Sequence, residues 1–212
     1  MNKLAITAAL AAIAVPSAYL SAQNAEAPGA MDASRVTAGT YAADPAHTLV
    51  EWRLDHFGFN PYFGLFGDIE GTLDLDPANL AAAKVDVQIP IAAVAVASEG
   101  LKDHLLRPGK DGGDPDFFGP EPGMARFVST GVTPLGGTRA IINGTLTMNG
   151  KSGPVALIAQ FSGAGTNPMS QAETVGFTAE TTIQRSAWGI AYGIPMIGDE
   201  VDLKISAAFE KQ

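Results

Sequence analysis

Hydrophobic and polar residues alternate along most of the chain after residue 40, which is the pattern of a β-strand with one buried face and one solvent-exposed face. In the first such run, Val50, Trp52 and Leu54 alternate with charged residues. His56 continues the apolar row, so we expect an imidazole at the end of the inward-facing side chains. A glycine- and aromatic-rich break over residues 57–64 then leads into a second alternating run.

Six later segments repeat this alternation: residues 84–91, 127–132, 140–148, 155–161, 175–183 and 201–209. Asn149-Gly150 is a strong signal for a two-residue hairpin, and Gly136-Gly137 is a second one, so neighbouring strands are expected to be antiparallel. The one helical candidate is short, from Ser98 to Leu106. The sequence therefore predicts an all-β fold, a single antiparallel eight-stranded barrel with a short helix near one end. A closed sheet of that size holds one small ligand.

One long loop interrupts the alternation of apolar and polar residues. Residues 107–123 are rich in glycine, proline and aspartate, yet they carry Phe117-Phe118 in the middle. Loops of this length are uncommon inside a compact domain and often serve as lids or binding loops. Two adjacent phenylalanines need an apolar environment. We expect them either to plug one end of the barrel or to form part of a ligand portal.

The N-terminal residues 1–22 have the order of a secretory signal peptide, with Lys3 followed by an apolar, alanine-rich stretch and then by small residues. The apolar stretch is shorter than the roughly 20 residues that a membrane-spanning helix requires, so no stable membrane anchor is expected. With cleavage after Ala22, residues 23–39 are predicted to be a flexible leader and residues 40–212 to be the folded domain. The mature protein is therefore predicted to be periplasmic.

Composition excludes several classes of function. The 212 residues include no cysteine, which rules out disulfides, thiolate metal sites and a thiol nucleophile. A formal net charge of −9 argues against nucleic acid as a partner. His47 and His56 are an odd number of residues apart and would face opposite sides of a regular strand, so they and His104 predict no metal site. The chain also has no Gly-x-Ser-x-Gly motif and no phosphate-binding loop, and no catalytic residues are predicted.

Ten short motifs, taken together in their order and spacing, resemble the YceI-like family over residues 40–210. They are Asp44-Pro45-Ala46-His47-Thr48, His56-Phe57-Gly58-Phe59, a turn at Gly64-Leu65-Phe66, Gly71-Thr72-Leu73-Asp74, Asp103-His104-Leu105, Phe117-Phe118, Phe127-Val128-Ser129-Thr130, Gly144-Thr145-Leu146-Thr147 with Gly150, Arg185-Ser186-Ala187-Trp188-Gly189-Ile190, and Ile197-Gly198-Asp199-Glu200-Val201. No single motif is decisive, and the specificity lies in the whole set.

The resemblance implies a lipocalin-like barrel with a long apolar tunnel. It also implies a protein that binds a polyisoprenoid, an isoprenoid quinone or a similar long-chain amphiphile, without catalysis and without a cofactor. A long-chain isoprenoid-like lipid is then the expected partner, and a homodimer is compatible with the sequence. Together with strand parity, the resemblance gives these candidate ligand-binding residues: Val50, Trp52, Leu54, His56, Phe66, Leu101, His104, Leu105, Phe117, Phe118, Phe127, Arg185 and Trp188.

This chain departs from the family's pattern near the expected mouth of the barrel. Residues 106–116 form an insertion before the two phenylalanines, and Glu121-Pro122-Gly123 stands where Lys-Tyr-Pro is common. Ala187 occupies a position that is often acidic, which puts in doubt any polar network anchored there. Ligand choice is therefore less transferable from the family than the fold.

Three charged or polar side chains leave alternatives open. Arg185 is expected to pair with an acidic residue at the barrel rim or to meet an anionic headgroup. His56 and His104 are expected either to close the barrel end through hydrogen bonds or to grip the polar head of a ligand. Two other functions are weighed beside lipid carriage: an enzyme that uses one of these histidines as a base, and a stress-related interaction protein whose lumen is filled by its own side chains.

Overall fold

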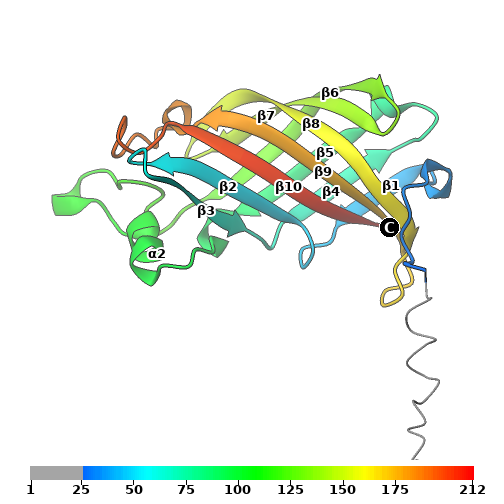
Figure 1. Ribbon diagram of the computed structural model, residues 1–212, viewed down its shortest axis with the longest axis horizontal. Coiled ribbons are helices and arrows are strands. Elements are labelled where there is room, and N and C mark those ends of the chain that lie inside the picture. The colour runs from blue at the N-terminus through cyan, green and yellow to red at the C-terminus, as the bar shows by residue number, and fades with distance from the viewer. Residues whose placement is uncertain (1–25) are drawn as a thin grey trace, which may run out of the picture.

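The strands of the computed structural model, which describes residues 26–212, form one antiparallel sheet that closes into a barrel (Figure 1). The predicted signal peptide lies outside the described residues. The sheet order is β1-β4-β5-β6-β7-β8-β9-β10-β2-β3, and β1 also pairs with β10. The strands are β1 (Gly39–Ala43), β2 (Leu49–His56), β3 (Asn60–Phe66), β4 (Glu70–Leu75), β5 (Lys84–Pro90), β6 (Met124–Gly136), β7 (Arg139–Met148), β8 (Lys151–Thr166), β9 (Glu173–Gln184) and β10 (Glu200–Lys211).

The barrel has eight strand positions, because two of them are each split into two segments. β1 and β2 follow one another along the same edge of β10, where β1 pairs with residues 209–211 and β2 with residues 202–206. β4 pairs with β1 and β3 pairs with β2, so β3 and β4 make up the second split position. The predicted eight-stranded antiparallel barrel is confirmed, and the two interruptions account for the ten segments.

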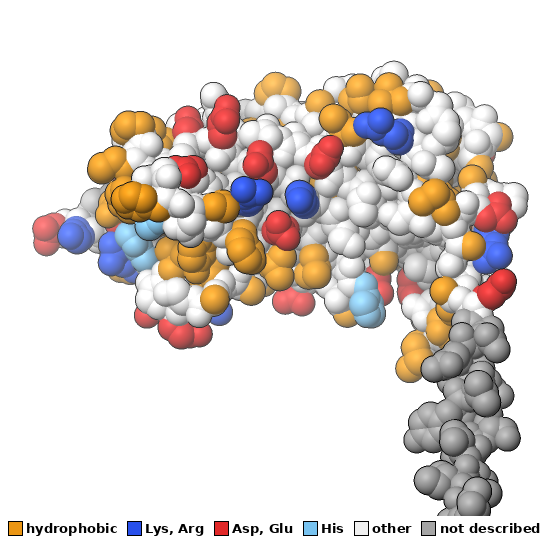
Figure 2. Space-filling model, in the orientation of Figure 1, with side chains coloured by type: hydrophobic (Ala, Val, Ile, Leu, Met, Phe, Trp, Pro, Cys, Tyr) orange, Lys and Arg blue, Asp and Glu red, His pale blue; other side chains and the backbone are white. Residues whose placement is uncertain are grey.

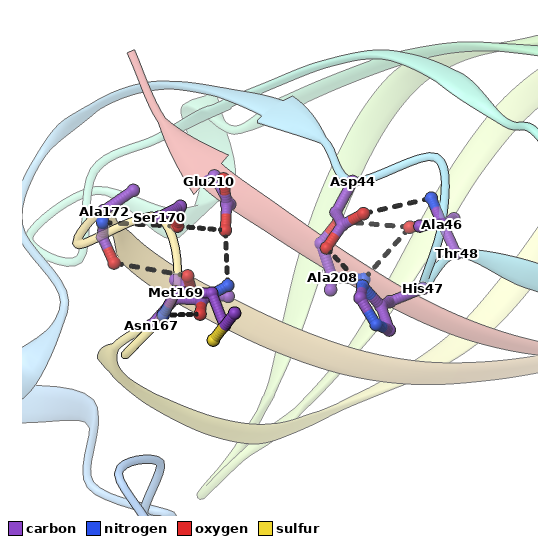
Figure 3. Close-up of polar contacts among 11 residues, drawn as sticks. Asp44, Ala46, His47, Thr48, Asn167, Met169, Ser170, Ala172, Ala208 and Glu210 are labelled. Atoms are coloured by element: carbon purple, nitrogen blue, oxygen red, sulfur yellow. Dashed lines mark hydrogen bonds and ion pairs between the residues drawn. The ribbon is translucent and has the colours of Figure 1, made fainter.

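Side chains of residues 44–48 build the interruption between β1 and β2 (Figure 3). Asp44 accepts the backbone N–H of Ala46 at 3.0 Å and lies 2.6 Å from Nδ1 of His47, which is exposed. Thr48 Oγ1 lies 3.2 Å from the nitrogen and 3.1 Å from the oxygen of Ala208. The hydroxyl thus takes the place of a main-chain partner, so the backbone groups of β10 stay hydrogen-bonded at the interruption between β1 and β2.

The break predicted over residues 57–64 is shorter than expected. His56 and Asn60 already pair across the two strands, so only three residues form the turn. Phe57 and Gly58 supply it with φ angles of 59° and 69°. The last three residues of β3, which were expected to turn, continue the strand instead, because they stay in register with β2. The predicted hairpin at Asn149-Gly150 is confirmed, with positive φ at both residues.

The connection from β5 to β6 covers the barrel at what we call the helix end, on the left of Figure 1. It contains η3 (Ile91–Ala93), α2 (Glu99–Leu106) and η4 (Lys110–Gly112). α2 is the predicted helix, and the side chain of Ser98 caps it by accepting the N–H of Leu101 at 3.2 Å. The outer edge of β3 meets this connection through paired hydrogen bonds between Leu65 and Ala95. Among the described residues, no helix has both the length and the apolar character needed to cross a membrane.

The residues before β1 lie at the opposite end of the barrel, which we call the leader end. Residues 23–39 were predicted to be flexible, but Ala30 and Ala164 exchange backbone hydrogen bonds of 3.0 and 2.8 Å. η1 (Ala33–Arg35) follows, and η2 (Leu80–Ala82) lies between β4 and β5. The described part of the leader is therefore attached to the barrel, because it completes hydrogen bonds at the edge of β8 that no other strand supplies there.

Candidate functional site

A cavity of about 640 Å³ runs inside the barrel between the helix end and the leader end. Inward-facing residues of β2 to β10 form its wall, for example Val85, Val87 and Ile89 of β5. Ala33 and Val36 of the leader border it at one end. Strand alternation is the cause, because every second side chain of a closed sheet must point to the interior.

The cavity wall is apolar, and the few side chains in it that can carry a charge near neutral pH are all basic. His56 and His104 belong to the helix end, Arg139 lies at the start of β7, and Arg185 follows β9. Among the described residues, no aspartate or glutamate lines the cavity, although the chain contains 22 acidic residues. The acidic side chains therefore lie outside the cavity. A cationic ligand would lose its hydration inside without gaining a carboxylate partner.

Three rings and a carboxylate form what we call the gate cluster at the helix end. The ring of His104 lies 5.1 Å from those of Phe117 and Tyr192, and these two rings are 5.4 Å apart. Asp116 Oδ2 lies 2.9 Å from Nη2 of Arg107 and 2.7 Å from Nε2 of His104. Hydrogen bonds from Arg107 and then from His104 hold the pKa of Asp116 below its ordinary value. The carboxylate therefore ties the inserted loop to the helix that carries His104.

Phe118 packs beside this cluster on the cavity side. Its ring lies edge-on to that of Phe66 at 6.2 Å, and its N–H donates to the carbonyl of Leu105 at 3.0 Å. Phe117 and Phe118 both line the cavity and pack against the larger apolar cluster of the interior. They close the helix end in this structure, and the choice between a fixed plug and a movable portal stays a prediction.

Arg185 is buried, and its hydrogen-bond partners are main-chain oxygens instead of the acidic residue that was one of the two expectations. Its guanidinium donates to four backbone carbonyl oxygens at 2.8–3.0 Å, those of Gly198, Ile190, Tyr192 and Ile197. Asp199 accepts instead from the N–H and the hydroxyl of Ser186. The expected ion pair at the rim is wrong, because the loop that connects β9 to β10 folds around the guanidinium and satisfies its donors with main-chain oxygens. Burial lowers the pKa of Arg185, while the nearby charge of Asp199 opposes that effect.

A second polar group, the leader clamp, fastens the leader end. Glu173 accepts the N–H and the hydroxyl of Thr37, both at 2.7 Å, and the hydroxyl of Tyr41 at 2.5 Å. Lys211 donates to the Thr37 hydroxyl and lies 3.8 Å from Glu173. Burial alone would raise the pKa of Glu173, but the hydrogen bonds from Tyr41 and Thr37 outweigh it and hold the pKa low. Burial, followed by the bond to Glu173, raises the pKa of Tyr41 to about 12.

Twelve of the thirteen candidate ligand-binding residues lie in the wall of the cavity. Trp188 is the exception. Its Nε1 donates to the carbonyl of Leu146 at 3.1 Å, and its ring lies over Gly153, so it packs against the β7–β8 hairpin instead of facing the cavity. Sequence reasoning missed Tyr192 and Val36, which both border the cavity. Neither belongs to an alternating run, and strand parity therefore carried no signal for them.

A closed antiparallel barrel around an apolar cavity defines the class of lipocalin-like β-barrels. Residues 41–209 match the YceI-like domain, and the chain belongs to that family. One relative, described as "UPF0312 protein" from Pseudomonas fluorescens (strain SBW25), is 32% identical over 205 residues, which cover 96% of this chain and 97% of the relative.

Two solved structures share the fold. Burkholderia cenocepacia BcnA superposes with a TM-score of 0.63 at 24% identity, covering 78% of this chain and 98% of that chain. A structure described as a polyisoprenoid binding domain from Saccharophagus degradans superposes with a TM-score of 0.53 at 12% identity, covering 81% of this chain and 98% of that chain. At these identities the likeness concerns the fold alone.

Proposed function

We propose that this protein binds and carries a long-chain amphiphile of the isoprenoid kind inside the barrel. The observation that carries the proposal is the cavity of about 640 Å³ with its apolar wall. That volume is in the range of small-molecule sites, and burial of apolar ligand surface supplies about 25 cal/mol per Å². The fold shared with a polyisoprenoid binding domain gives further support.

The ionisable groups of the wall favour one kind of headgroup. Of the basic wall groups whose donors are not taken up by main-chain oxygens, His56 and His104 belong to the helix end and Arg139 to the start of β7, and among the described residues the wall has no acidic side chain. A neutral headgroup with oxygen acceptors, or an anionic one, can accept from such donors, whereas a cationic headgroup would find no counter-charge. The proposed ligand therefore places its polar end at the helix end and its chain toward the leader end.

Carriage is favoured over catalysis by the way the two histidines are held. His104 is paired with Asp116, and the ring of His56 lies edge-on to Phe57 at 4.5 Å. Among the described residues, neither ring hydrogen-bonds to a serine, threonine or tyrosine hydroxyl that could act as a nucleophile, and the carboxylate beside His104 is shared with Arg107. The open volume of the cavity speaks against a lumen filled by the protein's own side chains.

Export to the periplasm is part of the proposal, supported by the signal-peptide pattern of residues 1–22. Fractionation of cells that produce the full chain tests it: the processed protein should be released with the periplasmic fraction. Recovery of unprocessed chain in the cytoplasm would contradict export without touching the binding proposal.

Organic extraction of purified protein and native mass spectrometry test ligand binding directly. A long-chain lipid should co-purify and add its mass to the native protein. Fluorescence gives a second readout with all-trans-retinol as the probe, because Trp52 lines the cavity and Trp188 does not. Quenching should vanish in Trp52→Phe and persist in Trp188→Phe. The proposed function would be contradicted if no lipid co-purifies and no long-chain probe quenches the tryptophan fluorescence.

A further inference from the structure

The hairpin of β2 and β3 exposes large apolar side chains at the helix end of the barrel. Phe59 is 88% exposed and Phe63 is 63% exposed, and Phe57 is 46% exposed. Tyr192 and Met196 of the β9–β10 connection are also exposed, by 44% and 61%. We call these five side chains the aromatic tip. Figure 2 shows hydrophobic side chains gathered at this end of the molecule, beside a histidine.

The aromatic tip has a composition unlike that of the rest of the surface. Residues 56–66 read HFGFNPYFGLF and contain no lysine, arginine, aspartate or glutamate, in a chain with 35 such residues. Asp55, just before this run, has its Oδ2 bound to the N–H of Gly58 at 2.7 Å, so this carboxylate is used to close the turn. A soluble protein exposes an apolar patch of this kind where it binds a partner.

Contacts connect the aromatic tip to the cavity. Phe57 donates its N–H to the carbonyl of Met196 at 2.8 Å, and its ring lies edge-on to His56 in the cavity wall. Tyr192 packs on Phe117 and His104 of the gate cluster. A surface that meets the tip therefore meets the closure of the cavity at the same time.

These observations lead to one occupant. We propose that the aromatic tip is a docking surface for a lipid bilayer, through which the cavity exchanges its ligand. The inference rests on the proposed function, because a long-chain amphiphile is held in membranes and has little freedom to leave them through water. Aromatic side chains on a segment that carries no charge of its own suit the interface of a bilayer, where a ring sits at the level of the headgroups, and Arg53, the cross-strand partner of Phe63, adds a cation beside them. The absence of acidic residues from residues 56–66 also spares the tip from repulsion by anionic lipids.

Vesicle flotation with the full mature chain tests the proposal. The probe is a vesicle of phosphatidylcholine, with and without one-fifth phosphatidylglycerol. The variant Phe59→Ser with Phe63→Ser should float at least ten-fold less than the wild type. The control variant Met169→Ser with Leu135→Ser changes two residues that are 90% and 50% exposed but lie away from the helix end, Met169 in the β8–β9 turn and Leu135 near the end of β6. It should float like the wild type. Equal flotation of the two variants, or no flotation of the wild type, would overturn the proposal.

Transfer kinetics separate docking from ligand binding. Protein loaded with all-trans-retinol should release it to acceptor vesicles at a rate that rises with vesicle concentration, and this dependence should be lost in the Phe59, Phe63 variant. Retinol affinity measured without vesicles should be the same in all three proteins. If retinol binds but its transfer rate does not depend on vesicle concentration, only the docking proposal fails. Vesicle binding without retinol binding would contradict the proposed function instead. A change from dimer to monomer in the tip variant, with unchanged flotation, would make the tip a self-association surface and overturn docking.

Discussion

Trp52 and Gly64 face each other across β2 and β3, and the indole fits there because glycine has no Cβ atom. A Cβ atom added at Gly64 would lie 2.5 Å from Cζ2 of Trp52 and 2.7 Å from a methyl carbon of Val96. Carbon atoms that are not bonded to each other do not approach this closely. The indole or the segment of residues 91–123 would therefore have to move. The pair therefore links the barrel wall to the segment that covers the helix end.

Gly64→Ala should lower the free energy of unfolding by about 1–3 kcal/mol, the usual cost of overpacking a core. Urea unfolding of the variant gives the value. The combination with Trp52→Phe should recover part of the loss, since the smaller ring leaves space for the methyl group, and a double-mutant cycle measures this coupling. Gly131→Ala is the matched control, because a Cβ atom there would meet nothing within 4 Å. Additive effects of the two changes would contradict a direct contact.

Thr48→Val should destabilise the barrel by about 1–3 kcal/mol, although the two side chains have nearly the same shape. The hydroxyl of Thr48 bonds to both the nitrogen and the oxygen of Ala208. The oxygen keeps the N–H of Asp44 as a second donor, but the substitution leaves the partly buried N–H of Ala208 without a partner. Thr133→Val, at an exposed position in β6, should change little. Amide hydrogen exchange at Ala208 should speed up in the first variant only. Equal stability of the two variants would show that the hydroxyl is dispensable.

Phe117→Ala together with Phe118→Ala should speed lipid release more than it lowers the stability of the barrel. Each ring covers the helix end of the cavity, and the apolar area that it buries there contributes to closure at about 25 cal/mol per Å². Release of all-trans-retinol and urea unfolding are measured on the same double variant. A large drop in the unfolding midpoint with an unchanged release rate would identify the two phenylalanines as a structural plug.

Arg185→Lys should destabilise the β9–β10 connection by ~3 kcal/mol or more. A lysine ammonium cannot reach the four carbonyl oxygens that the guanidinium bridges. One of these bonds is buried and three are partly buried, and a buried oxygen left without a donor costs about 1–3 kcal/mol. Hydrogen exchange of residues 189–198 should accelerate while the centre of β10 stays protected. Retention of protection in the loop would mean that the guanidinium does not organise it.

The leader clamp should weaken in acid. The folded-state pKa of Glu173 lies below its ordinary value, so ionised Glu173 contributes stability that is present above the unfolded pKa and is lost as the pH falls through the folded pKa. Glu173→Gln should therefore show a smaller loss of stability than the wild type between about pH 5 and pH 3. Glu70→Gln, at an exposed position in β4, should keep the acid dependence of the wild type. Hydrogen exchange at Thr37 reports on the clamp, and identical acid profiles of all three proteins would contradict its role.

Strand parity alone predicted most of the cavity wall. Val50, Trp52 and Leu54 line the cavity because side chains of a closed sheet alternate between interior and solvent, whatever the rest of the fold does. The turn at Asn149-Gly150 and the helix after Ser98 were equally predictable, since each depends on residues that are adjacent in the chain. The motif set was sufficient to predict the family. Which of the candidate residues touch a ligand stays a prediction.

Only the tertiary structure decided how the ends of the barrel are closed. The split between β1 and β2 depends on Thr48 meeting Ala208, and the attachment of the leader depends on Thr37 meeting Glu173, both across more than a hundred residues of chain. Arg185 found main-chain oxygens in place of an acidic partner, and the backbone of a loop leaves no pattern in the side-chain sequence. Local alternation is fixed by the geometry of the strand itself. The partners of a buried polar group are fixed by whichever distant segment folding brings within hydrogen-bond distance.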